Sequence, residues 1–176
     1  MKKFIILILM VFVFAGCNKE NAQQTKSVYA VELKAGSPAV DFLYKDIDGN
    51  PFRLSGKKGE VVILYFWRMK CPECMNDMRS LDELSRKYKE KGLLVAAINA
   101  DSMHSAPFTQ VQEFLKEHNY AFLNIRDDEG FVSEAYNIIK APHAFIIDKN
   151  SVIVSVKDQK TGWMDADTTK LIESLL

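Results

Sequence analysis

The chain has little cysteine and no excess charge of either sign. It contains three cysteines in 176 residues, whereas disulfide-dense secreted scaffolds use more, so its core must form by apolar packing. Lysine plus arginine and aspartate plus glutamate each number 23, which gives a formal net charge of zero and indicates no nucleic-acid partner. Repeats and long low-complexity runs are also missing. With 48% hydrophobic residues, these features indicate one ordinary globular domain.

The apolar run near the start is too short for a transmembrane helix, which needs about 20 residues. Residues 4–15 follow two lysines and fit the hydrophobic region of a secretory signal peptide. Small residues then precede Cys17, as in the bacterial lipobox, where the cysteine becomes the lipidated first residue. We therefore expect a signal peptide over residues 1–16, a lipid on Cys17 and a polar tether over residues 17–36. An uncleaved anchor is the alternative, and both place the rest of the chain on the periplasmic or extracytoplasmic side of the bacterial cell envelope.

Beyond the tether, apolar periodicity predicts an α/β domain with a mixed sheet over residues 37–176. The clearest strand covers residues 61–67, where an unbroken β-branched and aromatic run indicates burial on both faces. The next segment has helical periodicity and ends near Gly92, after which residues 93–98 complete a βαβ unit with parallel strands. The other expected elements are a hairpin (40–45 and 52–54), helices (107–118, 131–136 and 167–175), an extended segment (121–125) and an antiparallel strand pair (144–148 and 152–157).

Cys71 and Cys74 fall where the buried strand meets the long helix. Pro72 suits the first helical turn, where its missing N–H is not needed. Cys71 therefore stands near the helix N-terminus, whose free N–H groups and dipole stabilise a thiolate. Because the thiolate is the species that attacks a disulfide, we assign Cys71 as nucleophile and Cys74, one turn further on, as resolving thiol.

Two other uses of the cysteine pair are less well supported. A zinc site needs two further ligands, and His104, His118 and His143 show no paired spacing, so no metal is expected. An inert structural bridge across so short a loop removes little entropy from the unfolded chain. The pair is therefore predicted to be a redox-active disulfide that needs no other cofactor.

Several short motifs surround this pair. They are Phe66-Trp67, Tyr136 with Ile138, the segment from Ala141 to Asp148, and, near the start, Pro38 to Phe42 with Asp48-Gly49 and Leu54-Ser55. With these motifs the chain, from about Gly36 to its end, resembles the thioredoxin superfamily. Within it, the chain is similar to the TlpA/ResA branch of extracytoplasmic thiol–disulfide oxidoreductases, which shares features with peroxiredoxin-type redoxins. The resemblance implies a thioredoxin-like fold, a central mixed sheet flanked by helices, with an N-terminal β-hairpin.

The resemblance also implies a function, the reduction or exchange of disulfides in secreted proteins, as in cytochrome c maturation or envelope repair. The partners would be extracytoplasmic protein thiols or disulfides and a thiol reductant in the membrane or periplasm. We expect the protein to act as a monomer. The direction of electron flow stays open, because Lys70 before the pair favours the Cys71 thiolate whereas Glu73 within it opposes that thiolate.

Pro142 matches the cis-proline that the family places beside its cysteines. An extended substrate segment would pair with the backbone there, so Ala141, Pro142 and His143 are the implied substrate contacts. An ordinary trans turn before a strand is the alternative for Pro142. Trp67 is grouped with this substrate-binding region, although we expect it to pack beneath the active-site loop as part of the core.

Many of these reductases carry a carboxylate three residues after the second cysteine, and Asp77 stands there. Residues three apart share a helix face, so Asp77 is a candidate proton acceptor for the Cys74 thiol. Thioredoxins proper instead use a buried aspartate six residues before the first cysteine, where this chain has Tyr65. The family's helix-kinking proline is replaced by Arg79. The alternative for Asp77 is a solvated helix acid.

Three other functions remain as alternatives. A copper-binding module would use both thiols and a histidine, and His143, beside the expected cis-proline, is the only histidine expected near the site. A peroxidase of the peroxiredoxin type needs Thr or Ser three residues before the reactive cysteine, where this chain has Arg68. A purely structural lipoprotein would hold Cys71 and Cys74 in a bond that mild thiols do not open.

Overall fold

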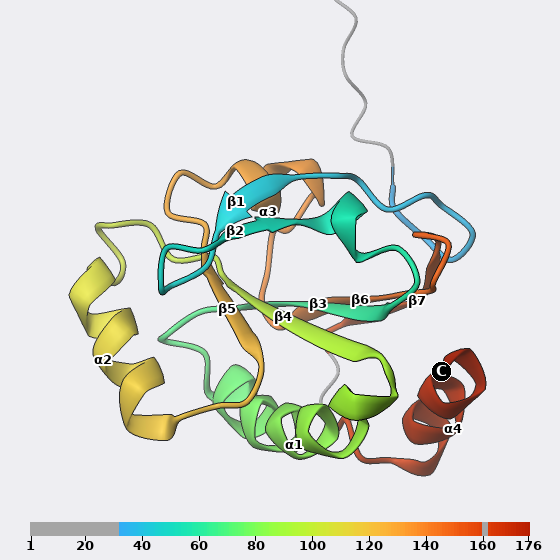
Figure 1. Cartoon of the computed structure of the whole chain (residues 1–176). Helices are drawn as coiled ribbons and strands as arrows, with labels where there is room; N and C mark the ends of the chain where they lie inside the picture. The colour runs from blue at the N-terminus through green and yellow to red at the C-terminus, as the bar shows by residue number, and fades with distance from the viewer. Residues whose placement is uncertain (1–31, 160–161) are drawn as a thin grey trace, which may run out of the picture.

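The centre of the fold is a five-stranded mixed sheet in the order β5-β4-β3-β6-β7 (Figure 1). The computed structural model describes residues 32–159 and 162–176. Strands β3, β4 and β5 run parallel, and β6 and β7 are antiparallel to their neighbours. The strand bounds are β3 Val61–Trp67, β4 Leu93–Asn99, β5 Leu123–Arg126, β6 His143–Ile147 and β7 Ile153–Asp158. The mixed α/β sheet predicted from the sequence is confirmed.

Strand β3 lies in the middle of the sheet, and every one of its residues is buried. Its unbroken apolar sequence is what a strand covered on both faces requires. Alternate side chains enter different clusters: Tyr65 and Trp67 belong to one, whereas Phe66 belongs to the other. The sheet therefore separates two apolar cores.

The helices divide between these two cores. One face is covered by α1 (Pro72–Tyr88), α2 (Phe108–His118) and α4 (Ala166–Leu175), whose apolar residues pack with Tyr65 and Trp67. The other face is covered by α3 (Phe131–Ala135) and a separate β1–β2 hairpin (Leu43–Lys45 and Pro51–Arg53). Figure 1 shows α1 and α4 on the side of the sheet opposite α3 and the hairpin. The N-terminal hairpin is thus confirmed, with a first strand shorter than predicted and a second strand that begins one residue earlier.

The end of the long helix differs in detail from the prediction. Helix α1 ends at Tyr88, and a 3₁₀ turn at Lys89–Lys91 follows it. Gly92 caps that turn, with a φ of 94° that favours glycine, instead of capping α1 directly. Helix α1 runs through Arg79 as one element of 17 residues. Its N-terminus therefore has a fixed position relative to the sheet.

The first residues of the described region already contact the domain. Leu33 packs against the hairpin-side core, and the Gly36 N–H donates to the Ile153 carbonyl at 2.8 Å. The predicted signal peptide, the lipidation at Cys17 and most of the tether lie outside the described residues. Within residues 32–159 and 162–176, no helix combines the length and the apolar character needed to cross a bilayer.

Candidate active site

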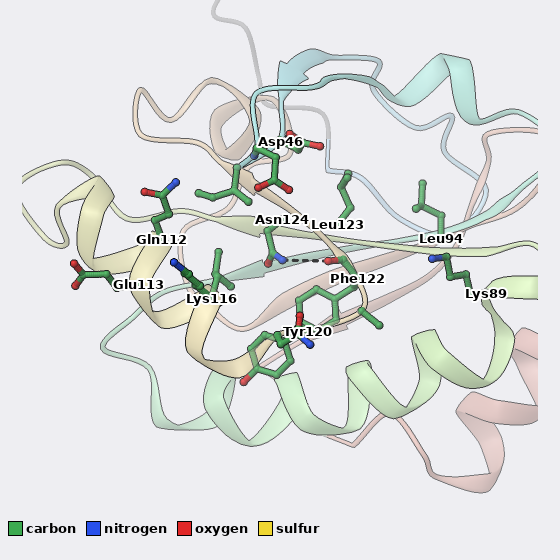
Figure 2. Close-up of a pocket in the computed structure, with 15 residues that line it drawn as sticks. Asp46, Lys89, Leu94, Gln112, Glu113, Lys116, Tyr120, Phe122, Leu123 and Asn124 are labelled. Atoms are coloured by element: carbon green, nitrogen blue, oxygen red, sulfur yellow. Dashed lines mark hydrogen bonds between the residues drawn. The ribbon is translucent and has the colours of Figure 1, made fainter.

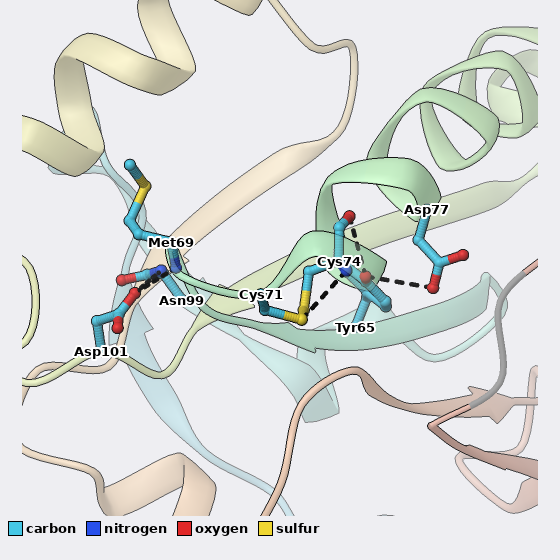
Figure 3. The surroundings of a disulfide bond; sticks show 7 residues. All are labelled: Tyr65, Met69, Cys71, Cys74, Asp77, Asn99 and Asp101. Atoms are coloured by element: carbon cyan, nitrogen blue, oxygen red, sulfur yellow. Dashed lines mark hydrogen bonds between the residues drawn. A yellow bond between two sulfur atoms is a disulfide. The ribbon is translucent and has the colours of Figure 1, made fainter.

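Cys71 and Cys74 form a disulfide with an S–S distance of 2.02 Å at the start of α1 (Figure 3). Cys71 is the N-cap residue, with extended φ and ψ of −129° and 99°, and Pro72 follows as the first helical residue. The Cys74 N–H donates to the Cys71 Sγ at 3.1 Å. A thiolate at Cys71 would receive the same hydrogen bond and the positive end of the helix dipole.

The two cysteines differ in access to solvent. Cys71 is 8% exposed, whereas Cys74 is fully buried. An incoming disulfide therefore reaches the Cys71 sulfur first, which agrees with the nucleophile assignment. Lys70 and Glu73 both lie exposed beside the motif, so water and salt screen their opposed effects on the thiolate.

The turn that leads into the motif is held by a buried polar network. The Met69 N–H donates to the Asp101 Oδ2 at 2.7 Å, and the Asn99 side-chain amide donates to the same oxygen at 3.0 Å (Figure 3). The buried Arg126 guanidinium donates to the Asn99 side-chain oxygen and, at 2.7 Å, to the Ala106 carbonyl. Strands β4 and β5 thereby fix the backbone two residues before Cys71.

Asp77 is buried, at 1% exposure, on the face of α1 that packs against the sheet. Its Oδ1 accepts the Gly162 N–H at 3.1 Å, and its Oδ2 accepts from the Tyr65 hydroxyl at 3.3 Å. The same hydroxyl lies 3.3 Å from the Cys74 carbonyl oxygen. The geometry therefore differs from that of a solvated helix acid and links Asp77 to the backbone of the resolving cysteine.

Burial raises the pKa of the Asp77 carboxyl, because a desolvated charge is disfavoured. The Gly162 N–H, the indole of Trp163, the Tyr65 hydroxyl and the positive charge of Lys157 act in the opposite direction and lower that pKa. The Trp163 Nε1 is buried and forms no hydrogen bond of standard geometry. The net effect keeps the pKa of the Asp77 carboxyl above its usual value.

The Ala141–Pro142 peptide bond is cis, as the sequence predicts. His143, the next residue, begins β6 and pairs with Phe66, so the cis bond lies beside the end of β3 from which the cysteine motif follows. Ala141 packs against the cluster that contains both cysteines. The Pro142 carbonyl accepts the Gln159 N–H at 2.9 Å.

The side chains of His143 and Trp67 lie on opposite faces of the sheet. The ring of His143 lies 5.0 Å from that of Phe145, in the core on the other face of the sheet, and its Nδ1 lies 3.3 Å from Asp158. Trp67 is fully buried, with its ring 5.7 Å from that of Phe114. Trp67 therefore packs in the core cluster that contains both cysteines, as expected.

A cleft of about 850 Å³ lies away from the disulfide. Figure 2 shows it lined by side chains of α2, β5, the hairpin turn and Lys89, at the end of α1 remote from Cys71. No cysteine or cis-proline residue lines it. Among the described residues, His, Cys, Asp and Glu side chains form no group of three suited to a metal ion.

Comparison with known proteins identifies the family. Residues 35–156 match the AhpC/TSA family. The chain belongs to this family. Thiol-disulfide oxidoreductase ResA of Bacillus thuringiensis subsp. konkukian is 30% identical over 164 residues, which cover 92% of each chain. Thioredoxin-like protein YneN of Bacillus subtilis is 30% identical over 156 residues, covering 89% of each chain.

Solved structures give the same result for the fold. The crystal structure of a DsbE thiol:disulfide interchange protein from Chlorobium tepidum matches with a TM-score of 0.67 and 30% identity, over 80% of this chain and 94% of that one. This member of the AhpC/TSA family thus has a thioredoxin-like fold and is a thiol–disulfide oxidoreductase. Both had been predicted from the sequence.

Sequence reasoning missed the partners that surround these residues. Tyr65 was read as a replacement for a thioredoxin aspartate, although a phenol on a buried strand requires a hydrogen-bond partner, and this could have pointed to Asp77. Trp163 and Asp101 gave no comparable signal, because each reaches the site from a loop distant in sequence.

Proposed function

We propose that this family member reduces or exchanges disulfides in extracytoplasmic proteins, cytochrome c maturation being one process that needs such a reaction. The observation that supports this most directly is the Cys71–Cys74 disulfide at the N-terminus of α1, with the first cysteine 8% exposed and the second fully buried. The relatives named thiol-disulfide oxidoreductases support the same reaction class. The disulfide itself would be the only redox group required.

The reaction begins with the reduced pair. The Cys71 thiolate attacks one sulfur of a substrate disulfide, forming a mixed disulfide and releasing the other substrate sulfur as a thiolate, which takes up a proton. Cys74 then loses its proton and attacks the Cys71 sulfur, which releases the second substrate thiol. Two electrons have passed to the substrate, and the Cys71–Cys74 bond remains. A dithiol reductant of the membrane or periplasm would regenerate the pair in two exchanges. Its first thiolate attacks the Cys71 sulfur and releases Cys74, and its second thiol then displaces Cys71 and leaves the reductant as a disulfide.

Asp77 would accept the Cys74 proton when the resolving thiol attacks. Its burial and raised pKa suit such a role, because an acceptor works best with a pKa near the working pH. The substrate would lie along the backbone of Ala141 beside the cis Pro142, by strand addition. His143 would take no part, since its ring lies on the far face of the sheet.

The same proposal includes the location of the protein. A lipid on Cys17 would hold a monomeric domain on the extracytoplasmic face of the membrane, through the tether predicted over residues 17–36. Support comes from the signal-peptide pattern of residues 1–16. Metabolic labelling with a radioactive fatty acid tests this, because Cys17→Ser should abolish the label.

The central experiment is substrate trapping in cells. A Cys74→Ser variant lacks the resolving thiol, so mixed disulfides at Cys71 should accumulate and run as adducts that a reductant removes. The matched control is Cys71→Ser, which retains the buried thiol and should trap nothing. Equal adducts in both variants would contradict the assignment.

Assays of the purified protein distinguish this proposal from the other uses of the two thiols. A peroxidase would consume hydrogen peroxide with the reduced protein, whereas we expect no consumption, because Arg68 stands where peroxide-binding Thr or Ser is required. A copper module would bind Cu(I) stoichiometrically and show no insulin reduction. An inert structural bond would stay oxidised in a glutathione redox buffer.

A further inference from the structure

The Tyr65 hydroxyl occupies a position between two acceptors near the disulfide. It lies 3.3 Å from the Asp77 Oδ2 and 3.3 Å from the Cys74 carbonyl oxygen, as Figure 3 shows. Tyr65 is buried in the middle of β3, and its ring packs edge-on against Trp163 at 6.0 Å. The ring is therefore held in place, and the hydroxyl cannot turn to water.

A phenol carries one hydrogen, so it donates fully to one acceptor at a time. When Asp77 is ionised, the hydrogen favours the carboxylate, because hydrogen bonds to charged acceptors are the stronger ones. The Cys74 carbonyl then receives little from Tyr65. When Asp77 is protonated, the carboxylic O–H can donate to the Tyr65 oxygen, and the Tyr65 hydrogen turns to the Cys74 carbonyl.

We propose that Tyr65 is a positioning residue that transmits the protonation of Asp77 to the backbone of Cys74 during resolution of the mixed disulfide. The inference rests on the proposed role of Asp77 as proton acceptor. The Cys74 proton passes to Asp77, Asp77 donates to Tyr65, and Tyr65 directs its own hydrogen to the Cys74 carbonyl. No proton is lost from Tyr65.

The phenol stays neutral throughout, since burial, together with the nearby Asp77 charge, raises the pKa of Tyr65 far above the working range. Tyr65 thus transmits a change of hydrogen-bond direction and never a charge. The change is local, because the Cys74 carbonyl belongs to the first turn of α1, where the resolving sulfur is attached.

Other groups besides Tyr65 act on the Asp77 carboxyl. From β7, Lys157 lies 3.8 Å from Asp165 and 5.2 Å from the Trp163 ring, and its charge lowers the Asp77 pKa without a direct hydrogen bond. From the loop before α4, the Gly162 N–H bonds to Oδ1 and the Trp163 indole faces the carboxylate. Of the groups named around Asp77, Tyr65 is the one that contacts both Asp77 and Cys74.

The test uses 5,5′-dithiobis(2-nitrobenzoate) at one equivalent per reduced protein, in a Cys17→Ser background. Attack by Cys71 releases the first coloured thiolate, and resolution by Cys74 releases the second, so stopped-flow absorbance separates the two steps. Rates are measured between pH 5 and pH 9 for the parent and for Tyr65→Phe, which keeps the ring and removes the hydroxyl.

We expect the second phase of Tyr65→Phe to shift its apparent pKa upward by roughly 0.5–1 pH unit, because the Asp77 carboxylate loses a donor. At pH values below that pKa, the raised apparent pKa slows the second phase about three- to tenfold, while the rate of the first phase stays unchanged. In Asp77→Asn, the added Tyr65→Phe change should have no further effect on the pH profile. Tyr136→Phe is the matched control, since that buried hydroxyl donates to the Val40 carbonyl, 2.8 Å away, in the other core.

Three results would overturn the inference. One is a Tyr65→Phe variant whose second-phase rate depends on pH as in the parent, while Asp77→Asn changes that dependence. In that case the proposed role of Asp77 is retained and the role of Tyr65 is not. Another is an equal slowing of both phases, which indicates a purely structural effect. The third is an Asp77→Asn profile like that of the parent, which also removes the proposed role of Asp77. Loss of both phases in Cys71→Ser checks the proposed function separately.

Discussion

At the scale of single residues, Asp77 differs from the other acids of α1 in its surroundings. It is buried against β3 and the loop before α4, whereas Glu73 and Glu83 on the same helix are exposed. Helical spacing from Cys74 made Asp77 a candidate for the inner face of α1, with a solvated helix acid as the alternative. Its burial depends on Gly162 and Trp163, which lie 85 residues or more further along the chain and carry no local signal.

Asp77→Asn should make stability less sensitive to pH. The native carboxyl has a raised pKa, so between the unfolded and native pKa values the native protein binds more protons and its free energy of unfolding falls as pH rises. Asparagine cannot ionise, so the free energy of unfolding of the variant does not fall with pH for this reason. The stability of the variant relative to the parent should therefore increase from pH 4 to pH 8 in urea denaturation of the oxidised proteins.

The control for this experiment is Glu83→Gln, which removes an exposed acid of the same helix. Its stability relative to the parent should stay nearly constant over the same pH range. A relative stability of Asp77→Asn that does not change with pH would show that the buried carboxyl is not destabilised by its surroundings.

At the scale of elements, the start of a helix is the feature that the sequence predicts most clearly. The Cys71–Pro72 start of α1 was predictable, because proline at the first position and a preceding extended cysteine are local features. The buried polar network before Cys71 was not predictable. In the sequence Arg126 looks like a solvated cation, and only the pairing of β5 with β4 places Asn99 beside it. Local patterns thus predicted the elements, and the buried polar contacts between them required the assembled sheet.

Asp165→Ala should destabilise the protein by about 1 kcal/mol, the usual cost of losing an N-cap. Asp165 caps α4, accepting the Thr168 N–H at 2.9 Å and the Thr168 hydroxyl at 2.6 Å. Asp165→Asn keeps a capping oxygen and should cost less. These values come from chemical denaturation at pH 7, and equal losses in the two variants would contradict a capping role.

The same cap should respond to acid. The Thr168 hydrogen bonds hold the pKa of Asp165 below its usual value. A carboxyl with a lowered native pKa stabilises the fold above its unfolded pKa, and this contribution is lost as pH falls through the native pKa. The difference between the parent and Asp165→Asn should therefore shrink when the denaturation is repeated near pH 3.

At the scale of the whole molecule, the C-terminal segment completes the site as well as the fold. Trp163 is fully buried between β3 and β7, with Tyr65 on one side and the Lys157 ammonium 5.2 Å from its ring. The thioredoxin-like order of elements was predictable from periodicity and motifs. The packing of residue 163 against the active-site helix was not, because a lone tryptophan in a polar loop has no periodicity to place it.

Trp163→Ala should lower the free energy of unfolding by about 3–5 kcal/mol, as expected for an emptied aromatic site in a core. The neighbouring Met164 is 38% exposed, so Met164→Ala is the matched control and should change stability by about 0.5 kcal/mol or less. Thermal and urea unfolding measure both. Similar losses at the two positions would contradict the packing described for this segment.

The central claim is that Cys71 attacks the substrate and Cys74 resolves it. Intact-mass spectrometry after exposure to glutathione disulfide tests it directly, using reduced single-cysteine variants in a Cys17→Ser background. We predict that Cys74→Ser, which keeps the accessible sulfur, gains one glutathione, whereas Cys71→Ser, which keeps the fully buried sulfur, gains none over the same time. Faster or equal modification of Cys71→Ser would contradict the account.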